Sequence, residues 1–235
     1  MVISVLYDNY EGRDGLRTAW GFSCLVEGLD QTVLFDTGGD GEILLHNMRV
    51  MEVAPARIDV LVLSHAHWDH TGGLAAFLEN NPEVTVYMPD SFPTELKEAV
   101  RECGAALRET NRPRGICPGI STTRVLGGPI PEQGLCVDGA EGGILITGCA
   151  HPGITQMAEA AKNICETGVD TVMGGFHLKD EWNTEINRIV AELKDLGVSR
   201  IGPCHCSGDA ARQKMASSFG EGYLEVSLGT RLELE

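Results

Sequence analysis

Hydrophobic and polar positions along the chain alternate with the periods of strands and helices. Short apolar runs bounded by Gly, Asp, Asn or Pro predict strands, at residues 2–7, 21–27, 31–36, 58–64, 84–88, 121–126, 135–138, 143–147, 169–173 and 198–201. Apolar positions three and four residues apart predict helices, at residues 41–50, 73–80, 93–103, 154–166, 182–196 and 209–219. Residues 223–234 alternate like a last pair of strands, whereas residues 110–119 predict an irregular loop.

Strands and helices are interspersed in both halves, and the chain shows no Pro/Ser-rich linker and no internal repeat. The order predicts one domain over residues 1–235, long enough for a full hydrophobic core. An α+β fold in four layers accounts for the pattern. In this αββα sandwich two sheets pack together and helices lie outside them.

The composition narrows the classes of partner. The formal net charge is −16 and no basic run offsets it, which disfavours a nucleic-acid partner because such a surface repels phosphate backbones. No window approaches the ~18 apolar residues of a membrane span, and the first residues lack the basic and apolar regions of a signal peptide. We therefore expect a cytoplasmic protein without a membrane partner, whose eight cysteines are reduced thiols.

Three of the seven histidines lie within six residues, directly after the apolar run 58–64. In His65-Ala-His67-Trp-Asp69-His70, the histidines at i and i+2 of an extended segment point to the same side, so two imidazoles can share one ion. The turn that follows brings Asp69 and His70 to a second position, and imidazole nitrogen and carboxylate oxygen are both zinc ligands. The sequence therefore predicts one or two divalent metal ions at this motif.

The motif His-x-His-x-Asp-His after a buried strand resembles the metal-binding signature of the metallo-β-lactamase-fold superfamily. The resemblance covers essentially the whole chain, and the segment 34–38 (Leu-Phe-Asp-Thr-Gly) is similar to the superfamily's second strand and turn, in which Asp36 supports the metal loop. The superfamily fold is the αββα sandwich predicted above. The resemblance thus implies a metal-dependent hydrolase.

Further ligands are implied by the same resemblance. His151 follows the strand at 143–147 and would complete a first site with His65 and His67. His205 follows the strand at 198–201 and would complete a second site with Asp69 and His70. A nitrogen-rich set of this kind suits Zn²⁺, with manganese, iron or nickel as alternatives.

One position departs from the superfamily pattern. Many members carry an Asp that bridges both metals, whereas here the strand at 143–147 runs into Gly148 and Cys149. Cys149 either ligates through its thiolate or is a small buried residue, and the number of ions stays open with it. Cys204 and Cys206 flank His205. On an extended segment they would face away from it, so we expect them to be structural.

Candidates for substrate contact lie in two other segments. Two adjacent glycines precede Phe176 and His177 after the strand at 169–173, a pattern typical of backbone approach to a ligand. His177 is a candidate general acid, substrate contact or metal ligand, and we expect it, with Asp69, to be catalytic. Arg112 and Arg114 on the predicted loop are candidate phosphate contacts, the alternative being ordinary solvated arginines.

Five short motifs narrow the resemblance, at residues 7–9, 20–23, 148–154, 174–178 and 203–208. Together they are similar to a dihydropteroate-synthase-like branch, tied to 7,8-dihydropterin-6-yl-methyl-4-(β-D-ribofuranosyl)aminobenzene 5′-phosphate synthase. The branch implies a phosphate-bearing, pterin-related small molecule.

Two reactions fit the same residues: hydrolysis by activated water, or a transferase reaction in which an arene nucleophile displaces diphosphate from the pterin methylene carbon. A lactonase or thiolesterase is an alternative, as is a non-catalytic metal- or ligand-binding sensor. A nuclease is disfavoured by the charge. The oligomeric state is not predicted.

Overall fold

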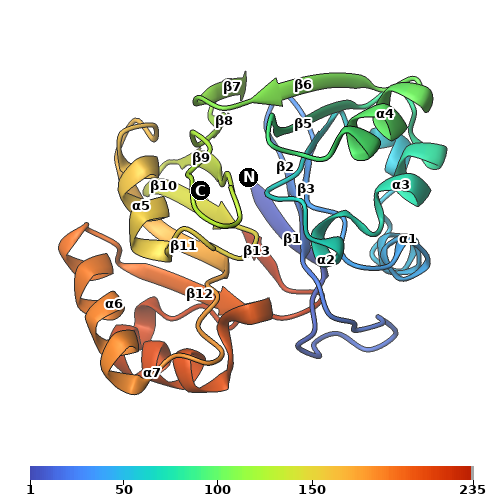
Figure 1. Ribbon diagram of the computed structural model, residues 1–235. Coiled ribbons are helices and arrows are strands. Elements are labelled where there is room, and N and C mark those ends of the chain that lie inside the picture. Colours follow the sequence, from blue (N-terminus) through green and yellow to red (C-terminus); the bar gives the residue numbers. More distant parts are fainter. Residues whose placement is uncertain (234–235) are drawn as a thin grey trace. The chain divides into compact units, whose positions relative to one another are not determined.

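The computed structural model describes residues 1–233, and the chain divides into two compact units (Figure 1). The described part of unit 1 comprises residues 1–111 and 227–233, and unit 2 comprises residues 112–226. Each unit contains one mixed sheet and a set of helices with its own apolar core. No helix in the described range is long and apolar enough to cross a membrane.

The sheet of unit 1 is antiparallel at one end and parallel at the other. Its strand order is β13 (Arg231–Glu233), β1 (Val2–Tyr7), β2 (Ser23–Glu27), β3 (Val33–Phe35), β4 (Val60–Val62), β5 (Thr85–Pro89) and β6 (Ala106–Thr110). The pairs from β13 to β3 are antiparallel, and those from β3 to β6 are parallel. Parallel pairing places the carboxyl ends of β3 and β4 at the same edge of this sheet.

The helices of unit 1 are α1 (Gly41–Val50), η1 (Pro55–Arg57), α2 (Trp68–Thr71), α3 (Leu74–Asn80) and α4 (Thr94–Glu102). Of these, α1, α3 and α4 contribute residues to an apolar cluster that they share with the sheet. The cluster joins Leu25, Leu34 and Leu61 of the strands to Leu44 and Phe77 of the helices. Helix α1 begins where it does because the Asp40 side chain accepts a hydrogen bond from the backbone N–H of Ile43.

The sheet of unit 2 has the same mixed character. Its order is β12 (Arg200–Cys204), β11 (Val169–Gly175), β10 (Gly142–Thr147), β9 (Leu135–Gly139), β8 (Ile120–Thr122) and β7 (Arg114–Cys117). β10, β11 and β12 run parallel, and the remaining pairs are antiparallel. The carboxyl ends of these three parallel strands therefore meet at one edge of the unit.

The helices of unit 2 are α5 (Ile154–Lys162), η2 (His205–Ser207), α6 (Asn183–Asp195), α7 (Asp209–Phe219) and η3 (Gly220–Gly222). In α6, four apolar residues at helical spacing are buried: Ile186, Ile189, Val190 and Leu193. They join Val172 and Ile201 of the sheet in the core of this unit. Gly197, which follows the helix, has a φ of 99° and so provides the predicted stop.

All six predicted helices are present, and the ten predicted strands match within a few residues. The segment 110–119 was wrongly predicted as a loop, since β7 occupies Arg114–Cys117. Strand β6 gave no signal because it is a polar edge strand with exposed side chains. In the predicted tail pair, 223–234, only Arg231–Glu233 forms a strand among the described residues, and residue 234 lies outside them.

Candidate metal centre

Asp36, directly after β3, organises the histidine motif of unit 1. Its carboxylate accepts hydrogen bonds from the backbone N–H and the hydroxyl of Ser64, both at 2.7 Å. It also lies 2.7 Å from Nδ1 of His70. Asp36 is buried and has a φ of 57°, a left-handed conformation that Asp tolerates better than most residues. The expected support of the metal loop by Asp36 is therefore present within unit 1.

These bonds set the tautomers of two histidines. An ionised carboxylate can only accept, so Nδ1 of His70 donates to Asp36 and Nε2 keeps its lone pair. The Ser64 hydroxyl donates its only proton to Asp36, and its oxygen lies 2.9 Å from Nδ1 of His65. Nδ1 of His65 must then donate to Ser64, which leaves the lone pair of this ring also on Nε2. One carboxylate thus prepares two imidazoles as ligands.

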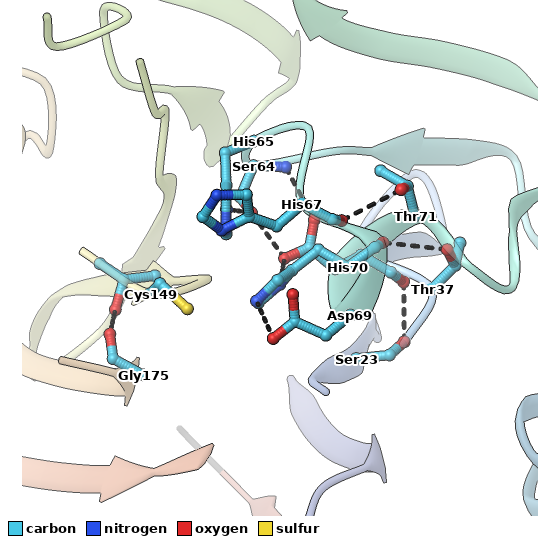
Figure 2. Close-up of polar contacts among 12 residues, drawn as sticks. Ser23, Thr37, Ser64, His65, His67, Asp69, His70, Thr71, Cys149 and Gly175 are labelled. Carbon is cyan, nitrogen blue, oxygen red and sulfur yellow. Dashed lines mark hydrogen bonds and ion pairs between the residues drawn. The ribbon is translucent and has the colours of Figure 1, made fainter. Parts of the chain in front are cut away.

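The nitrogen and oxygen atoms of the motif gather on one side of the loop (Figure 2). Nε2 of His65 lies 3.2 Å from Nδ1 of His67, and Nε2 of His70 lies 3.7 Å from Oδ2 of Asp69. Two imidazole nitrogens at ~2.0–2.1 Å from a tetrahedral zinc ion are about 3.3 Å apart. The spacing of His65 and His67 therefore fits a shared ion without rearrangement.

Local bonds fix the backbone of the motif. His67 is the N-cap of the one-turn helix α2, and the Thr71 hydroxyl donates to its carbonyl at 3.0 Å. The Thr37 hydroxyl donates to the carbonyl of His70 at 3.0 Å (Figure 2). A Cβ at Gly73 would lie 2.2 Å from the Thr37 carbonyl oxygen, so only glycine allows this approach. The backbone of the motif thus approaches Thr37 closely at Gly73.

In unit 2, a buried carboxylate plays the corresponding part. Glu132 accepts the backbone N–H groups of Cys149, Ala150 and His151, each at 2.9 Å. These residues form the loop that follows β10, and Ala150 has a left-handed φ of 57°. Sequence reasoning missed Glu132. The available signal was an acidic residue in the otherwise uncharged stretch 127–134.

The histidines and cysteines of unit 2 that could bind a metal or transfer a proton lie on the loops after β10, β11 and β12. The rings of His151 and His177 are 4.4 Å apart between centroids. The Cys206 thiol donates to the Cys149 sulfur at 3.2 Å and accepts the backbone N–H of His177 at 3.3 Å. The prediction of an extended segment at Cys204–Cys206 is wrong, because His205 begins the 3₁₀ turn η2. This turn brings Cys206 to Cys149 and to the backbone of His177, and the expected structural role of Cys204 and Cys206 stays a prediction.

The contact between Cys206 and His177 shifts both pKa values. A hydrogen bond with Cys206 raises the pKa of His177 above its ordinary value. Burial alone would raise the pKa of Cys206, but its hydrogen bonds with Cys149 and His177, together with the nearby His205 ring, hold that pKa well below the usual thiol range. The contact thus stabilises the thiolate form of Cys206 and the protonated form of His177 relative to the free groups.

Left-handed backbone is concentrated in these loops. Among the described non-glycine residues, Asp36, Ala150, His177 and His205 have φ values of 57°, 57°, 53° and 49°, and Glu52 is the fifth. Such conformations cost of order 1–3 kcal/mol each and persist where surrounding contacts enforce them. They lie after β3, β10, β11 and β12, and because such strain is common at functional sites, these strand ends are the candidate functional edges of the two units.

The remaining predicted residues are Arg112 and Arg114. Both side chains are exposed, Arg112 in the turn after β6 and Arg114 at the start of β7. Within unit 1 the structure brings together His65, His67, Asp69 and His70, and within unit 2 it brings His151 to His177. A role in phosphate binding for the two arginines stays a prediction.

Comparisons with known proteins identify the fold. The sequence model of the metallo-β-lactamase superfamily matches residues 21–205. The chain is 31% identical to 7,8-dihydropterin-6-methyl-4-(β-D-ribofuranosyl)-aminobenzene-5′-phosphate synthase of Methanocaldococcus jannaschii, over 97% of this chain and 94% of that protein. It is also 31% identical to an uncharacterized protein of the same organism, over 97% of this chain and all of that protein.

Solved structures agree with this result. Tm1679, described as a metal-dependent hydrolase of the β-lactamase superfamily, matches with a TM-score of 0.82 and 26% identity over 99% of this chain and 98% of its own. The metallo-β-lactamase-fold protein YhfI of Bacillus subtilis matches with a TM-score of 0.72 at 12% identity over 99% of both chains. The predicted fold class is confirmed, and the chain belongs to the metallo-β-lactamase superfamily.

Proposed function

We propose that this chain is a metal-dependent enzyme that acts on a phosphate- or diphosphate-bearing small molecule related to pterins. The observation that carries the proposal is the bond network of Asp36, which leaves the Nε2 lone pairs of His65 and His70 beside His67 and Asp69. A carboxylate behind a ligating imidazole is the usual outer support of a metal site. The family to which the chain belongs supports the same reading.

The proposed ligand sets follow the superfamily pattern. His65, His67 and His151 are assigned to one ion, and Asp69, His70 and His205 to a second. Zn²⁺ fits this nitrogen-rich set best, because imidazole and carboxylate in tetrahedral arrangement are its common ligands. The match of the family to residues 21–205, which include parts of both units, supports one functional domain.

The chain's own residues have defined tasks in this proposal. Asp69, beside His70 in the motif, accepts a proton from the attacking nucleophile and orients it. His177 on the loop after β11 donates a proton or hydrogen bond to the leaving oxygen, a task that its raised pKa favours. A bound divalent ion supplies Lewis acidity, which acidifies water and offsets negative charge on phosphate oxygens.

The class of substrate rests on the relative from M. jannaschii, whose name describes the synthesis of a phosphate-bearing pterin compound. Arg112 and Arg114 are proposed to contact the phosphate, since a guanidinium matches phosphate oxygens in a bidentate way. The relative's name favours the transferase reaction, in which an aminobenzene nucleophile displaces diphosphate from the pterin methylene carbon. Hydrolysis of a phosphoester is the reaction that the fold's water-activating chemistry would favour instead.

One assay separates these reactions. Zinc-loaded protein is incubated with 7,8-dihydropterin-6-ylmethyl diphosphate, with and without a ribosylated aminobenzene phosphate, and diphosphate release and product mass are followed. Release that requires the aminobenzene supports the transferase, and release without it supports a hydrolase. Turnover of lactones or thioesters alone would show that the substrate is a carboxylic ester or thioester and not a phosphate compound. Stoichiometric metal with no turnover of any of these would indicate a sensor and overturn the proposed enzyme.

A further inference from the structure

Two sequence motifs that the proposed ligand sets leave unused meet inside unit 2. One is the glycine pair before Phe176 and His177, and the other is Cys206 beside His205. Sγ of Cys206 lies 3.2 Å from Sγ of Cys149 and accepts the backbone N–H of His177. One ligand atom each of Cys149, His177 and Cys206 lies within 4.8 Å of the others. Two thiols and an imidazole therefore converge at the ends of three parallel strands.

The convergence depends on local features of the chain. A Cβ at Gly175 would lie 2.8 Å from Sγ of Cys206 and 2.2 Å from the carbonyl oxygen of Gly148, so glycine is needed to admit the thiol. The 3₁₀ turn at His205–Ser207 and the left-handed φ of His205 aim Cys206 at this point. Glu132 holds the loop that carries Cys149 through three backbone bonds. Hydrogen bonds to Glu132 and between the loops thus hold the three loops in place.

The donor set has the chemistry of a soft-metal site. Two thiolates and one imidazole are three of the four ligands of the Cys₂His type that zinc accepts. Two sulfurs at ~2.3 Å from a tetrahedral ion are about 3.8 Å apart, so the observed sulfurs need to separate by roughly 0.6 Å. The N–H of His177 already donates to Cys206, and such a bond supports a ligating sulfur. The protons that the two cysteines and the ligating nitrogen of His177 still hold leave to solvent when the ion binds.

We propose that unit 2 alone binds a soft divalent cation through Cys149, Cys206 and His177. This site uses none of the ligands of unit 1, so it does not rest on the proposed function. One ring nitrogen of His177 takes the ion, and the other stays able to donate to a substrate. The superfamily pattern expects an aspartate at the bridging position. Here Cys149 ligates through sulfur and is not merely a buried residue.

The test is Co²⁺ binding by the full-length, reduced apoprotein. Thiolate–Co²⁺ coordination gives a near-ultraviolet charge-transfer band that imidazole and carboxylate ligands do not give. We expect this band at one equivalent or more of Co²⁺, with about half of its intensity lost in Cys206→Ser because one of two sulfur ligands is removed. Cys149→Ser should have the same effect. Cys103→Ser, at the end of α4 in unit 1, is the matched control and should keep the whole band.

The variant His67→Ala separates this site from the proposed catalytic ions, because it should keep the sulfur band whatever its activity. Should the cysteine variants fail to fold, X-ray absorption of the zinc-loaded wild-type protein gives the same answer: a sulfur shell at ~2.3 Å is expected. A wild-type protein without a charge-transfer band, or with only nitrogen and oxygen around zinc, would overturn the proposal. A band that persists undiminished in both Cys149→Ser and Cys206→Ser would overturn it equally.

Discussion

Glu132 offers a test of how unit 2 holds its functional loop. Its two carboxylate oxygens accept three backbone N–H groups, two on Oε1 from Cys149 and Ala150 and one on Oε2 from His151. The substitution Glu132→Gln keeps the size of the side chain and removes the charge. An amide offers a single oxygen, so at least one N–H group then faces the NH₂ group and loses its acceptor.

The expected cost follows from these three bonds. Losing one hydrogen bond to a charged group costs about 1.5–3 kcal/mol, and the two that remain become neutral and weaken by roughly half. The smaller desolvation cost of a buried amide offsets a part of this loss. We therefore expect the free energy of unfolding to fall by about 2–4 kcal/mol, which for a chain of this size lowers the Tm by roughly 5–15 °C.

The assay is thermal unfolding of the metal-free protein followed by circular dichroism, with chelator competition to measure metal affinity. Glu159→Gln, an exposed glutamate on α5, is the matched control and should leave the Tm unchanged. Because the loop carries His151, we also expect about 10–100-fold weaker metal binding, the usual cost of losing an outer-shell partner. A Glu132→Gln protein with wild-type Tm and metal affinity would refute this role.

Three further changes test other parts of the structure. Asp36→Asn should weaken metal binding about 10–100-fold because the amide cannot serve both Ser64 and His70; an unchanged affinity in a chelator titration would contradict this. Gly175→Ala should lower the free energy of unfolding by about 1–3 kcal/mol, since its Cβ would lie 2.2 Å from a backbone oxygen. The control is Gly115→Ala, where nothing lies within 4 Å of the added Cβ. It should unfold like wild type in urea. Chelation should lower the Tm, by an amount that grows with metal affinity; equal melting curves with and without chelator would count against a bound ion.

The chain order of the elements could be predicted because most of them carry a strong apolar period. The four apolar residues of α6 recur at helical spacing, and all four are buried. Where the period is weak, prediction failed. β6 presents polar, exposed side chains at the edge of its sheet, so its strand character comes from pairing with β5 and not from its own pattern.

The histidine motif could be predicted from residue types because its donors are close in sequence. The bonds that prepare it could be derived only in part, since Asp36 reaches His70 across 34 residues. Glu132 stood out only as an acidic residue in an uncharged stretch. Its partners could not be predicted, because they are backbone N–H groups 17 to 19 residues away, and every non-proline residue carries such a donor. The position of Cys206 depended on a left-handed His205, which residue type does not indicate.

The central claim is that the histidine motif binds metal, and the most direct measurement is the metal content of the purified protein by plasma mass spectrometry. His67→Ala is compared with wild type and with His46→Ala, whose ring contacts the Gly15 carbonyl outside the motif. We expect wild type and His46→Ala to hold equal amounts of zinc or another transition metal, and His67→Ala to hold at least about one ion fewer per chain. Equal metal content in all three proteins, or none in wild type after reconstitution with excess metal, would contradict the claim.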